Sequence, residues 1–319
     1  MSGQPDPSIE TFIPAESAGL RAVFERLDPH FAELWSTHLS RLLSRPQLDS
    51  RTRFLILTGQ YTVTGRHHPL EVTIEAALDA GMRPSDLLEV ILQCYVYTGP
   101  WVVAAAADVY LRVLERRLEI ADDLWARVDD GGNRSLEEER ATWSEADRDD
   151  PRLAPLLEKY GWQGISTGLR LRPRHHINLV ATVDALDPDY LQTWLDAIYG
   201  GMYVRGVLDD RTRILCVVGN TLAAGEQHQS RRHMRSALRS GATPKELLEV
   251  IFQTTGLFGH THLMPAAIDD LVRIVDEEGR LDELAAPDRI DEVRRIVAAR
   301  AASRGGVAEI DLQTLEGEE

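Results

Sequence analysis

Hydrophobic side chains recur along this chain at the spacing of helix faces. Between residues 70 and 78 they follow the i, i+4, i+7, i+8 pattern of one buried stripe, and a second stripe runs from 87 to 95. No segment shows the sustained alternation of apolar and polar positions that marks a half-buried strand. The pattern therefore predicts an all-α fold.

Glycine and proline positions divide these stripes into helical hairpins. Gly81 and Gly241 stand where a left-handed C-terminal cap would end the earlier helix of each hairpin. From Thr243 to Glu246 the chain has an N-cap threonine, a proline at the first helical position and a glutamate three residues after the cap, which together favour a helix start. Gly99 and Gly259 are expected to break the second helix of each hairpin, before a third helix begins.

The chain contains an internal duplication. The motif DSRTR at 49–53 recurs as DDRTR at 209–213, and the segment 77–91 recurs at 237–251 with the same spacing of Ala-Leu, Gly, Pro and Leu-Leu-Glu-Val-Ile. Chance does not preserve spacing over such a distance. The sequence therefore predicts two homologous halves.

The duplication sets the expected domain boundaries. The predicted order is a first repeat at 1–130, an acidic linker with a short surface helix at 131–150, a second repeat at 151–280 and a polar C-terminal tail at 281–319. The glycine and charge content of the linker is typical of a solvated connector. Within the tail, a helix is expected from Pro287 to Ser303.

Composition and charge narrow the classes of function. The 319 residues carry 51 Asp and Glu against 35 Lys and Arg, a formal charge of -16, whose field repels nucleic acid and anionic membranes. The first residues lack the basic stretch and apolar run of a secretory signal, and no window approaches the roughly 18 apolar residues that span a bilayer. A cytoplasmic location is expected. Cys94 and Cys216 lie far apart, which excludes a disulfide framework, a thiolate zinc site and a dithiol redox motif within one chain.

Histidine is distributed unequally between the halves. Four of the ten histidines lie between 228 and 262. On a helix, Glu226, Gln229 and His233 are spaced i, i+3, i+7 and project along one stripe, with His233 at the edge of the apolar face. This residue should therefore point into a cleft or a helix interface, as a catalyst or as a hydrogen-bonded core histidine. The matching residues of the first half include no general base: Arg66, Pro69 and Thr73.

Other histidines of the second half are weaker candidates. His228 and His260 are predicted to contact substrate, because an unperturbed imidazole titrates at about 6.5 and exchanges protons at neutral pH. His262 is interpreted as structural. Three imidazoles and Glu226 could also bind zinc or iron. However, His228 and His233 are i, i+5, about 140° apart around a helix, unlike the i, i+4 pair of metal sites. Neither a metal nor another cofactor is predicted.

Gln253 and Arg213 complete the candidates for substrate contact. Gln93 and Gln253 are amides in otherwise apolar helices and need hydrogen-bond partners, either on a neighbouring helix or on a ligand. Two arginine pairs recur at an apparent helix start, Arg51 with Arg53 and Arg211 with Arg213, and one guanidinium of each pair either contacts a substrate carboxylate or forms a surface ion pair. Both interpretations stay open from the sequence.

Aromatic residues give a weaker signal. Tyr97 and Trp101 are interpreted as core aromatics. Because Tyr97 stands next to Gly99 and Pro100, it could instead line the mouth of a pocket.

These motifs resemble the carboxymuconolactone decarboxylase family, which also contains the alkylhydroperoxidase-D-like proteins. The resemblance rests on RTR at 211–213, HMRSALxxG at 233–241 and TxxELxEVIxQ at 243–253, and on fewer matches in the first half. It implies two tandem alkylhydroperoxidase-D-like helical domains, in a family that assembles into rings of trimers or hexamers. A homo-oligomer is expected, either a trimer of tandem repeats or a dimer.

The resemblance also implies an activity. The peroxidase branch uses a C-x-x-C followed by a histidine four residues after its second cysteine. Counting back from His233 puts Glu226 and Gln229 at the thiol positions, so thiol peroxidase activity is not expected. The decarboxylase branch keeps the histidine and lacks the dithiol. It implies His233 as proton donor to a carbanion-like carbon, with Gln229 or an arginine holding the substrate carboxylate.

The sequence thus predicts a cofactor-independent lyase, decarboxylase-like, or isomerase acting on a small carboxylated or lactone-type metabolite. The predicted catalytic residues are His233, Glu226 and Gln229, and the predicted substrate contacts are His260, His228, Gln253 and Arg213. The first half is expected to be a degenerate partner that completes the oligomer and one wall of the pocket. Two alternatives stay open: a non-catalytic oligomeric binding or scaffold protein, and a metal-dependent enzyme using the second-repeat histidines.

Overall fold

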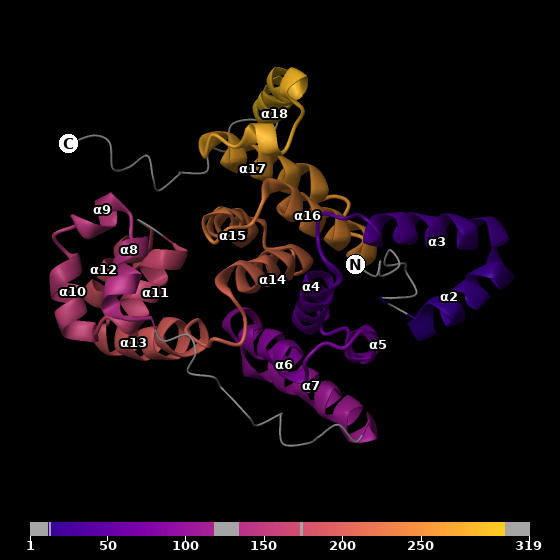
Figure 1. The fold of residues 1–319 in the computed structure, drawn as a ribbon, viewed down its shortest axis with the longest axis horizontal. Coiled ribbons are helices and arrows are strands. Elements are labelled where there is room, and N and C mark those ends of the chain that lie inside the picture. The colour runs from indigo at the N-terminus through magenta and orange to yellow at the C-terminus, as the bar shows by residue number, and fades with distance from the viewer. Residues whose placement is uncertain (1–11, 13, 118–133, 173–174, 304–319) are drawn as a thin grey trace, which may run out of the picture.

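The structure, a computed structural model, describes residues 12, 14–117, 134–172 and 175–303, and every regular element in them is a helix (Figure 1). The first repeat comprises α2 (Pro14–Leu27), α3 (Pro29–Leu43), α4 (Ser50–Val63), α5 (His67–Asp79), α6 (Pro84–Gln93) and α7 (Tyr95–Arg117). The second comprises α12 (His175–Leu186), α13 (Pro188–Trp194), the π-helix η1 (Leu195–Met202), α14 (Asp210–Ala223), α15 (Gln227–Arg239), α16 (Pro244–Phe258) and α17 (Met264–Glu277). The tandem all-α fold is confirmed.

A lobe of short helices precedes the second repeat: α8 (Leu136–Thr142), α9 (Glu145–Arg148), α10 (Leu153–Tyr160) and α11 (Gln163–Leu171). The sequence predicts a solvated linker over 131–150, but the described part of this segment packs on α11 and buries Trp143. Glu139 lies 3.0 Å from Arg170 across this contact. The acidic composition of the segment suggests exposure to solvent, but the charge of the buried Glu139 is compensated by Arg170 of the same lobe.

The C-terminal segment adds one further helix. After two short 3-10 turns, η2 (Leu281–Glu283) and η3 (Pro287–Arg289), the chain forms α18 (Ile290–Ser303), which packs on α17. Arg294 of α18 holds Asp276 of α17 at 2.6 Å. The helix predicted over 287–303 is present, apart from its first turn.

Helices α4 and α14 pack against each other at the centre of the molecule (Figure 1). Each carries a glycine at the contact, Gly59 and Gly219. A Cβ on Gly219 would lie 2.7 Å from Cγ2 of Ile56, closer than Cβ atoms come to other atoms in real proteins. The helices therefore approach more closely than side chains would allow, and the buried hydrophobic residues of the two repeats form one core.

Two equivalent ion pairs fasten the repeats together. Arg53 of α4 lies 3.3 Å from the Glu249 carboxylate on α16, and Arg213 of α14 lies 2.7 Å from the Glu89 carboxylate on α6. All four side chains are buried. Each pair joins the arginine of one repeat to the carboxylate of the other. Loss of either arginine would therefore leave a carboxylate buried with less compensation.

The helical hairpins have the predicted caps but differ at their ends. Gly81 and Gly241 have φ angles of 80° and 94° after the first helix of each hairpin. In the second repeat, α16 runs without interruption to Gly259. In the first repeat α6 ends at Gln93, and Gly99 interrupts α7 with a φ of 72°; the axes of α6 and α7 differ by 119°. The predicted break at Gly99 is therefore present, and the first repeat has an additional helix end at Gln93, although Cys94 keeps helical backbone angles.

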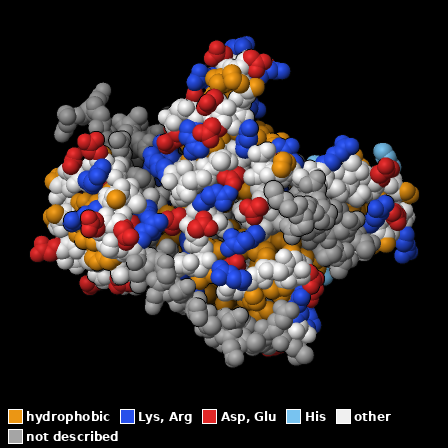
Figure 2. Space-filling model, viewed as in Figure 1, with side chains coloured by type: hydrophobic (Ala, Val, Ile, Leu, Met, Phe, Trp, Pro, Cys, Tyr) orange, Lys and Arg blue, Asp and Glu red, His pale blue; other side chains and the backbone are white. Residues whose placement is uncertain are grey.

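The surface mixes acidic and basic side chains, with hydrophobic side chains gathered over α6 and α7 (Figure 2). On α7, Trp101 is 86% exposed, so its interpretation as a core aromatic is wrong. Leu27 and Leu186, at equivalent corners of the repeats, are exposed as well. Such apolar surface is where a homo-oligomer would form, and that assembly stays a prediction.

Membrane-spanning potential is confined to one bent pair among the described helices. None of them is by itself long and apolar enough to cross a bilayer. Taken together, α6 and α7 have the necessary length and composition, but the two are bent by 119°.

Candidate functional site

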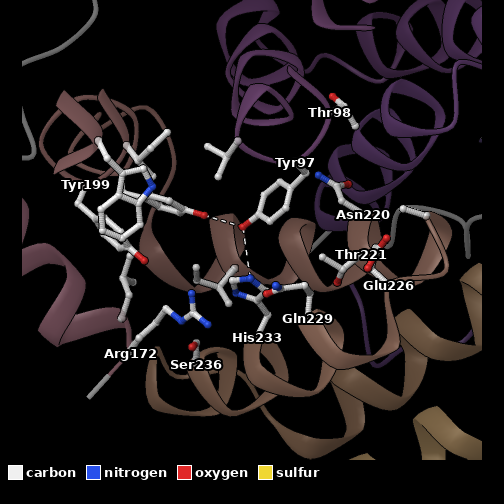
Figure 3. Close-up of a pocket in the computed structure, with 17 residues that line it drawn as sticks. Tyr97, Thr98, Arg172, Tyr199, Asn220, Thr221, Glu226, Gln229, His233 and Ser236 are labelled. Atoms are coloured by element: carbon white, nitrogen blue, oxygen red, sulfur yellow. Dashed lines mark hydrogen bonds between the residues drawn. The ribbon is translucent and has the colours of Figure 1, made fainter. Parts of the chain in front are cut away.

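A cavity of about 390 Å³ lies where the first turn of α7 meets α14, α15, the π-helix η1 and the end of α11. Its walls combine the aromatic rings of Tyr97, Trp194, Tyr199 and Tyr203 with a small number of polar groups. Figure 3 shows how these side chains converge from different parts of the chain. Both repeats therefore contribute to a hollow of the size and make-up of a small-molecule site.

Helix α15 supplies a polar stripe to this cavity. Glu226, the N-cap residue, is followed on the same face by Gln229, His233 and Ser236, and all four line the hollow (Figure 3). Glu226 is exposed at the rim, whereas His233 is only 4% exposed. The helical spacing predicts that these side chains face a cleft or a helix interface, and in the structure they face the cavity.

His233 is held as a neutral imidazole. Its Nε2 atom lies 3.4 Å from the Tyr97 hydroxyl, and its Nδ1 atom is buried without a hydrogen-bond partner among the described residues. Burial lowers the pKa of His233 to about 3, with a further contribution from the charges of Arg172 and Arg232. At neutral pH the ring is therefore a proton acceptor, rather than the proton donor that the family resemblance implies.

Two tyrosines carry the polar contacts across the cavity. The hydroxyls of Tyr97 and Tyr203 lie 2.6 Å apart, so one donates to the other. Burial, and then the neighbouring Tyr203, raise the pKa of Tyr97 well above its usual range, and burial raises the pKa of Tyr203 to about 12. Both phenols stay protonated at neutral pH. Tyr97 therefore lines the cavity, as in the alternative to a core position that the sequence offers, although burial keeps its hydroxyl away from solvent.

Arg172 provides the positive charge in this cavity. It follows the last residue of α11, and its Nη2 atom is buried without a hydrogen-bond partner among the described residues. Figure 3 shows the guanidinium pointing into the cavity, beside His233 and Ser236. Arg172 is not among the site residues predicted from the sequence. It lies in an arginine-rich stretch, LRLRPR at 169–174, which by itself does not tell which arginine meets the α15 stripe.

Arg213 and Gln253, predicted as substrate contacts, lie elsewhere. The Arg213 guanidinium is fully buried between Glu89 and Gln93, to whose Oε1 atom it donates at 3.0 Å. Gln253 accepts from Arg53 through its Oε1 atom at 3.2 Å. Neither residue lines the cavity. The side chains of Arg213 and Gln253 instead make the contacts that join the two repeats. For Gln253 this is the hydrogen bond to a neighbouring helix that the sequence offers as the alternative to a ligand contact.

His228 and His260 also lie outside the cavity lining. His228 is exposed on α15. The ring of His260 lies 5.8 Å from that of His262, and partial burial, followed by the charges of His262 and Arg66, lowers its pKa. Within the described part of the chain, no group of three or more His, Cys, Asp or Glu side chains has the arrangement to hold a metal ion.

A second buried histidine lies behind the cavity wall. His176 of α12 is fully buried, and its ring centroid lies 4.4 Å from that of Tyr199 and 6.1 Å from that of Trp194. Neither ring nitrogen has a hydrogen-bond partner among the described residues. Burial lowers the pKa of His176 to about 3, with further lowering by Arg172 and His175. His176, like His233, is therefore neutral at physiological pH.

Acid is expected to destabilise the protein through these two histidines. In the unfolded chain each binds a proton below pH about 6.5, whereas in the folded chain each resists protonation down to about 3. The unfolded state therefore binds more protons in this window, and stability falls as the pH falls. At pH 5 each residue should cost about 2 kcal/mol, or about 4 kcal/mol together. Urea unfolding at pH 7 and pH 5 measures the loss.

The variant His176→Leu isolates one of the two contributions. Leucine has a similar volume and does not titrate, so the variant should lose about 2 kcal/mol less than the wild type between pH 7 and pH 5. An equal loss in the two proteins would show that His176 is protonated in the folded state.

Two comparisons with known proteins bear on the identity of this site. A model of the carboxymuconolactone decarboxylase family matches residues 29–109 and again residues 188–268. An uncharacterized 15.0 kDa protein in the nqo9-nqo10 intergenic region of Paracoccus denitrificans is 34% identical over 102 residues, which are 31% of this chain and 70% of that protein. The two matched ranges fall on the two helical repeats and contain Tyr97 and His233.

Proposed function

The chain belongs to the carboxymuconolactone decarboxylase family, and from that premise we propose that it is a cofactor-independent enzyme that moves protons on a small carboxylated metabolite, as a lyase or an isomerase. The reaction takes place in the cavity between α7, α11, η1 and α15. His233 accepts a proton, and Arg172 holds a carboxylate of the substrate.

One observation carries this proposal: a neutral imidazole and a partly unpartnered guanidinium face the same cavity. A buried guanidinium nitrogen without a hydrogen bond is costly, and a carboxylate satisfies it through short, charge-assisted bonds. An imidazole next to the bound carboxylate can then remove a proton from an adjacent carbon. A scaffold protein has no need for either group in a hollow.

Gln229 and Glu226 complete the proposed site. Gln229 lies about one helical turn before His233, and its amide can donate to the substrate or accept from it. Figure 3 shows Glu226 and Arg172 on opposite sides of His233. The carboxylate of Glu226 therefore favours a hydroxyl or other donor group at the end of the substrate that is remote from its own carboxylate.

Thiol chemistry has no part in the proposal. Cys94 and Cys216 are both buried, and neither lines the cavity. Burial raises the pKa of the Cys94 thiol and raises that of Cys216 to about 12. Both cysteines therefore stay protonated and unreactive at neutral pH.

The variant Arg172→Met tests the proposed carboxylate site. The wild type should bind phenylacetate and should bind the uncharged phenylacetamide much more weakly, because only the acid pairs with the guanidinium. Loss of charged hydrogen bonds should weaken phenylacetate binding about 10- to 100-fold in the variant. Isothermal titration calorimetry measures both affinities.

Arg152→Met is the matched control. Arg152 lies at the start of α10, where it is paired with Asp150 at 2.6 Å, and it does not line the cavity. Its replacement should leave phenylacetate binding unchanged. Equal affinity of the wild type for the acid and the amide, or equal affinity of the Arg172 variant and the wild type for the acid, would remove Arg172 from the proposed site.

A further inference from the structure

The two repeats place different side chains at equivalent positions. Arg45 and Arg205 make the same ion pair with the opposite repeat, at 2.6 Å to Glu249 and 2.8 Å to Glu89, and this equivalence fixes the register between the repeats. In that register His233 corresponds to Thr73, Tyr203 to Leu43 and Tyr97 to Leu257. The three ionisable side chains His233, Tyr203 and Tyr97 all line the cavity, and none of them is kept at the equivalent positions.

The counterpart place in the other half is filled by side chains. The ring of Phe258 lies 4.9 Å from that of Tyr61, and the Arg66 guanidinium lies 4.8 Å above the Phe258 ring. The Cδ2 methyl of Leu42 occupies the space that a Cβ on Gly256 would need. The hollow and the three ionisable groups therefore go together, as expected if the groups act on a ligand rather than support the fold.

Local geometry brings Tyr97 to the second repeat. Cys94 keeps helical backbone angles after α6, and the helix changes direction at Gly99, so Tyr97 lies in the short turn before that break, where it lines the cavity together with residues of α15. Tyr203 follows the π-helix η1, whose residues Ile198 and Tyr199 also line the cavity. The Tyr97 hydroxyl is thereby fixed between the Tyr203 hydroxyl, at 2.6 Å, and His233 Nε2, at 3.4 Å. It occupies the position from which a proton can be given to a ligand beside His233.

We infer that Tyr97 is the catalytic acid that works opposite His233, and that the site enolises small oxo-carboxylates. This inference rests on the proposed function and deepens it, because it names a second catalytic residue and a class of substrate. The acid comes from the first repeat and the base from the second. The duplicated architecture is therefore part of the active site and not only a support for it.

The proposed step is balanced without a co-reactant. His233 Nε2 takes a proton from the carbon next to the substrate carbonyl, the carbon–hydrogen electron pair forms the carbon–carbon double bond, and the carbonyl oxygen receives the proton of Tyr97. The resulting imidazolium then returns a proton to the Tyr97 oxygen through their direct contact. A buried imidazolium and a buried phenolate are both costly, so this transfer restores two neutral side chains and leaves a neutral enol.

The position of Arg172 decides between the two reaction classes. A carboxylate paired with a guanidinium is stabilised in the ground state, and its loss as carbon dioxide would forfeit that interaction. The carboxylate bound at Arg172 is therefore retained, and the reaction at this site is keto–enol or double-bond proton transfer. The aromatic wall of Trp194 and Tyr199 favours a planar or aryl group on the substrate.

Phenylpyruvate in D2O tests the inference. It offers a carboxylate for Arg172, an aryl ring for the aromatic wall, and an acidic C3–H bond next to a ketone. The wild type should accelerate deuterium uptake at C3, followed by proton NMR, with saturation at high substrate. Tyr97→Phe should slow this uptake about 100-fold, because the oxyanion loses its proton donor, while phenylpyruvate affinity changes little.

Tyr190→Phe is the matched control. Tyr190 is 60% exposed on α13 and lies outside the cavity lining, so its replacement should leave the exchange rate unchanged. Saturable binding of phenylpyruvate without any exchange would overturn the enolising activity and leave the carboxylate site intact. Full exchange in Tyr97→Phe would overturn the role of Tyr97 as the catalytic acid. Absence of phenylpyruvate binding to the wild type would overturn the substrate class. Loss of phenylacetate binding as well would remove the proposed function itself.

Discussion

Replacing His233 with glutamine is expected to lower phenylpyruvate exchange about 1000-fold, within the range that a positioned general base contributes. The imidazole is the one basic group in the described cavity lining that combines burial, neutrality at pH 7 and contact with the proposed acid. Glutamine has a similar size but cannot accept a proton from carbon. The measurement is the rate of deuterium uptake at C3 at saturating substrate, compared with the wild type at pH 7.

Stability separates this effect from unfolding. The Nδ1 atom of His233 makes no hydrogen bond to the described residues, so the glutamine variant should retain its helicity and its urea midpoint at pH 7. It should also be more stable than the wild type at pH 5, because the variant lacks a buried base that resists protonation. His30→Gln, an exposed substitution on α3, is the control for histidine replacement. Wild-type exchange rates in a well-folded His233→Gln protein would end the case for catalysis by this residue.

Replacing Arg213 with methionine is expected to destabilise the protein by about 3–5 kcal/mol, since it removes one partner of a buried ion pair. Glu89 would remain fully buried, and among the described residues Arg205, at 2.8 Å, would be its remaining ion-pair partner. Urea unfolding at pH 7 gives the free energy. Adding Glu89→Gln to the variant should recover part of the loss, because the uncompensated charge is then removed.

Arg53→Met provides an internal comparison. Arg53 and Arg213 occupy equivalent positions, and each is fully buried against a carboxylate and an amide of the opposite repeat. The two variants should therefore lose similar free energy. Neither should change phenylacetate affinity under conditions where the protein is folded. A loss of affinity confined to Arg213→Met would restore the predicted substrate contact at this arginine.

Most of the fold follows from local patterns. The apolar stripe over 70–78, the glycine caps at Gly81 and Gly241 and the capping box of Thr243 and Glu246 each depend on neighbouring residues, and the structure has all of them. The end of α6 at Gln93 was not predictable, because Cys94 is no helix breaker and keeps helical backbone angles. The segment 131–150 misleads for a related reason: its carboxylates suggest solvent, but Glu139 has an arginine as its partner.

The candidate site was predictable only in part. The i, i+3, i+7 spacing of Glu226, Gln229 and His233 shows that they share one helix face, and the structure has that face in the cavity. The protonation state of His233 was not predictable, because the pKa depends on how completely other segments exclude water from the ring. Arg172 was missed because nothing in its own segment indicates what it meets.

The sequence by itself determined that the chain is a duplicated helical module and that one copy alone carries a histidine on the edge of its buried face. Helix periodicity and caps encode these features within a few residues, so they need no knowledge of the rest of the chain. Only the tertiary structure decided which groups share the cavity with that histidine. Tyr97 and Arg172 come from segments 136 and 61 residues away along the chain. Their convergence depends on a bend and on a packed lobe, and a local pattern specifies which side of a helix is buried but not what is buried against it.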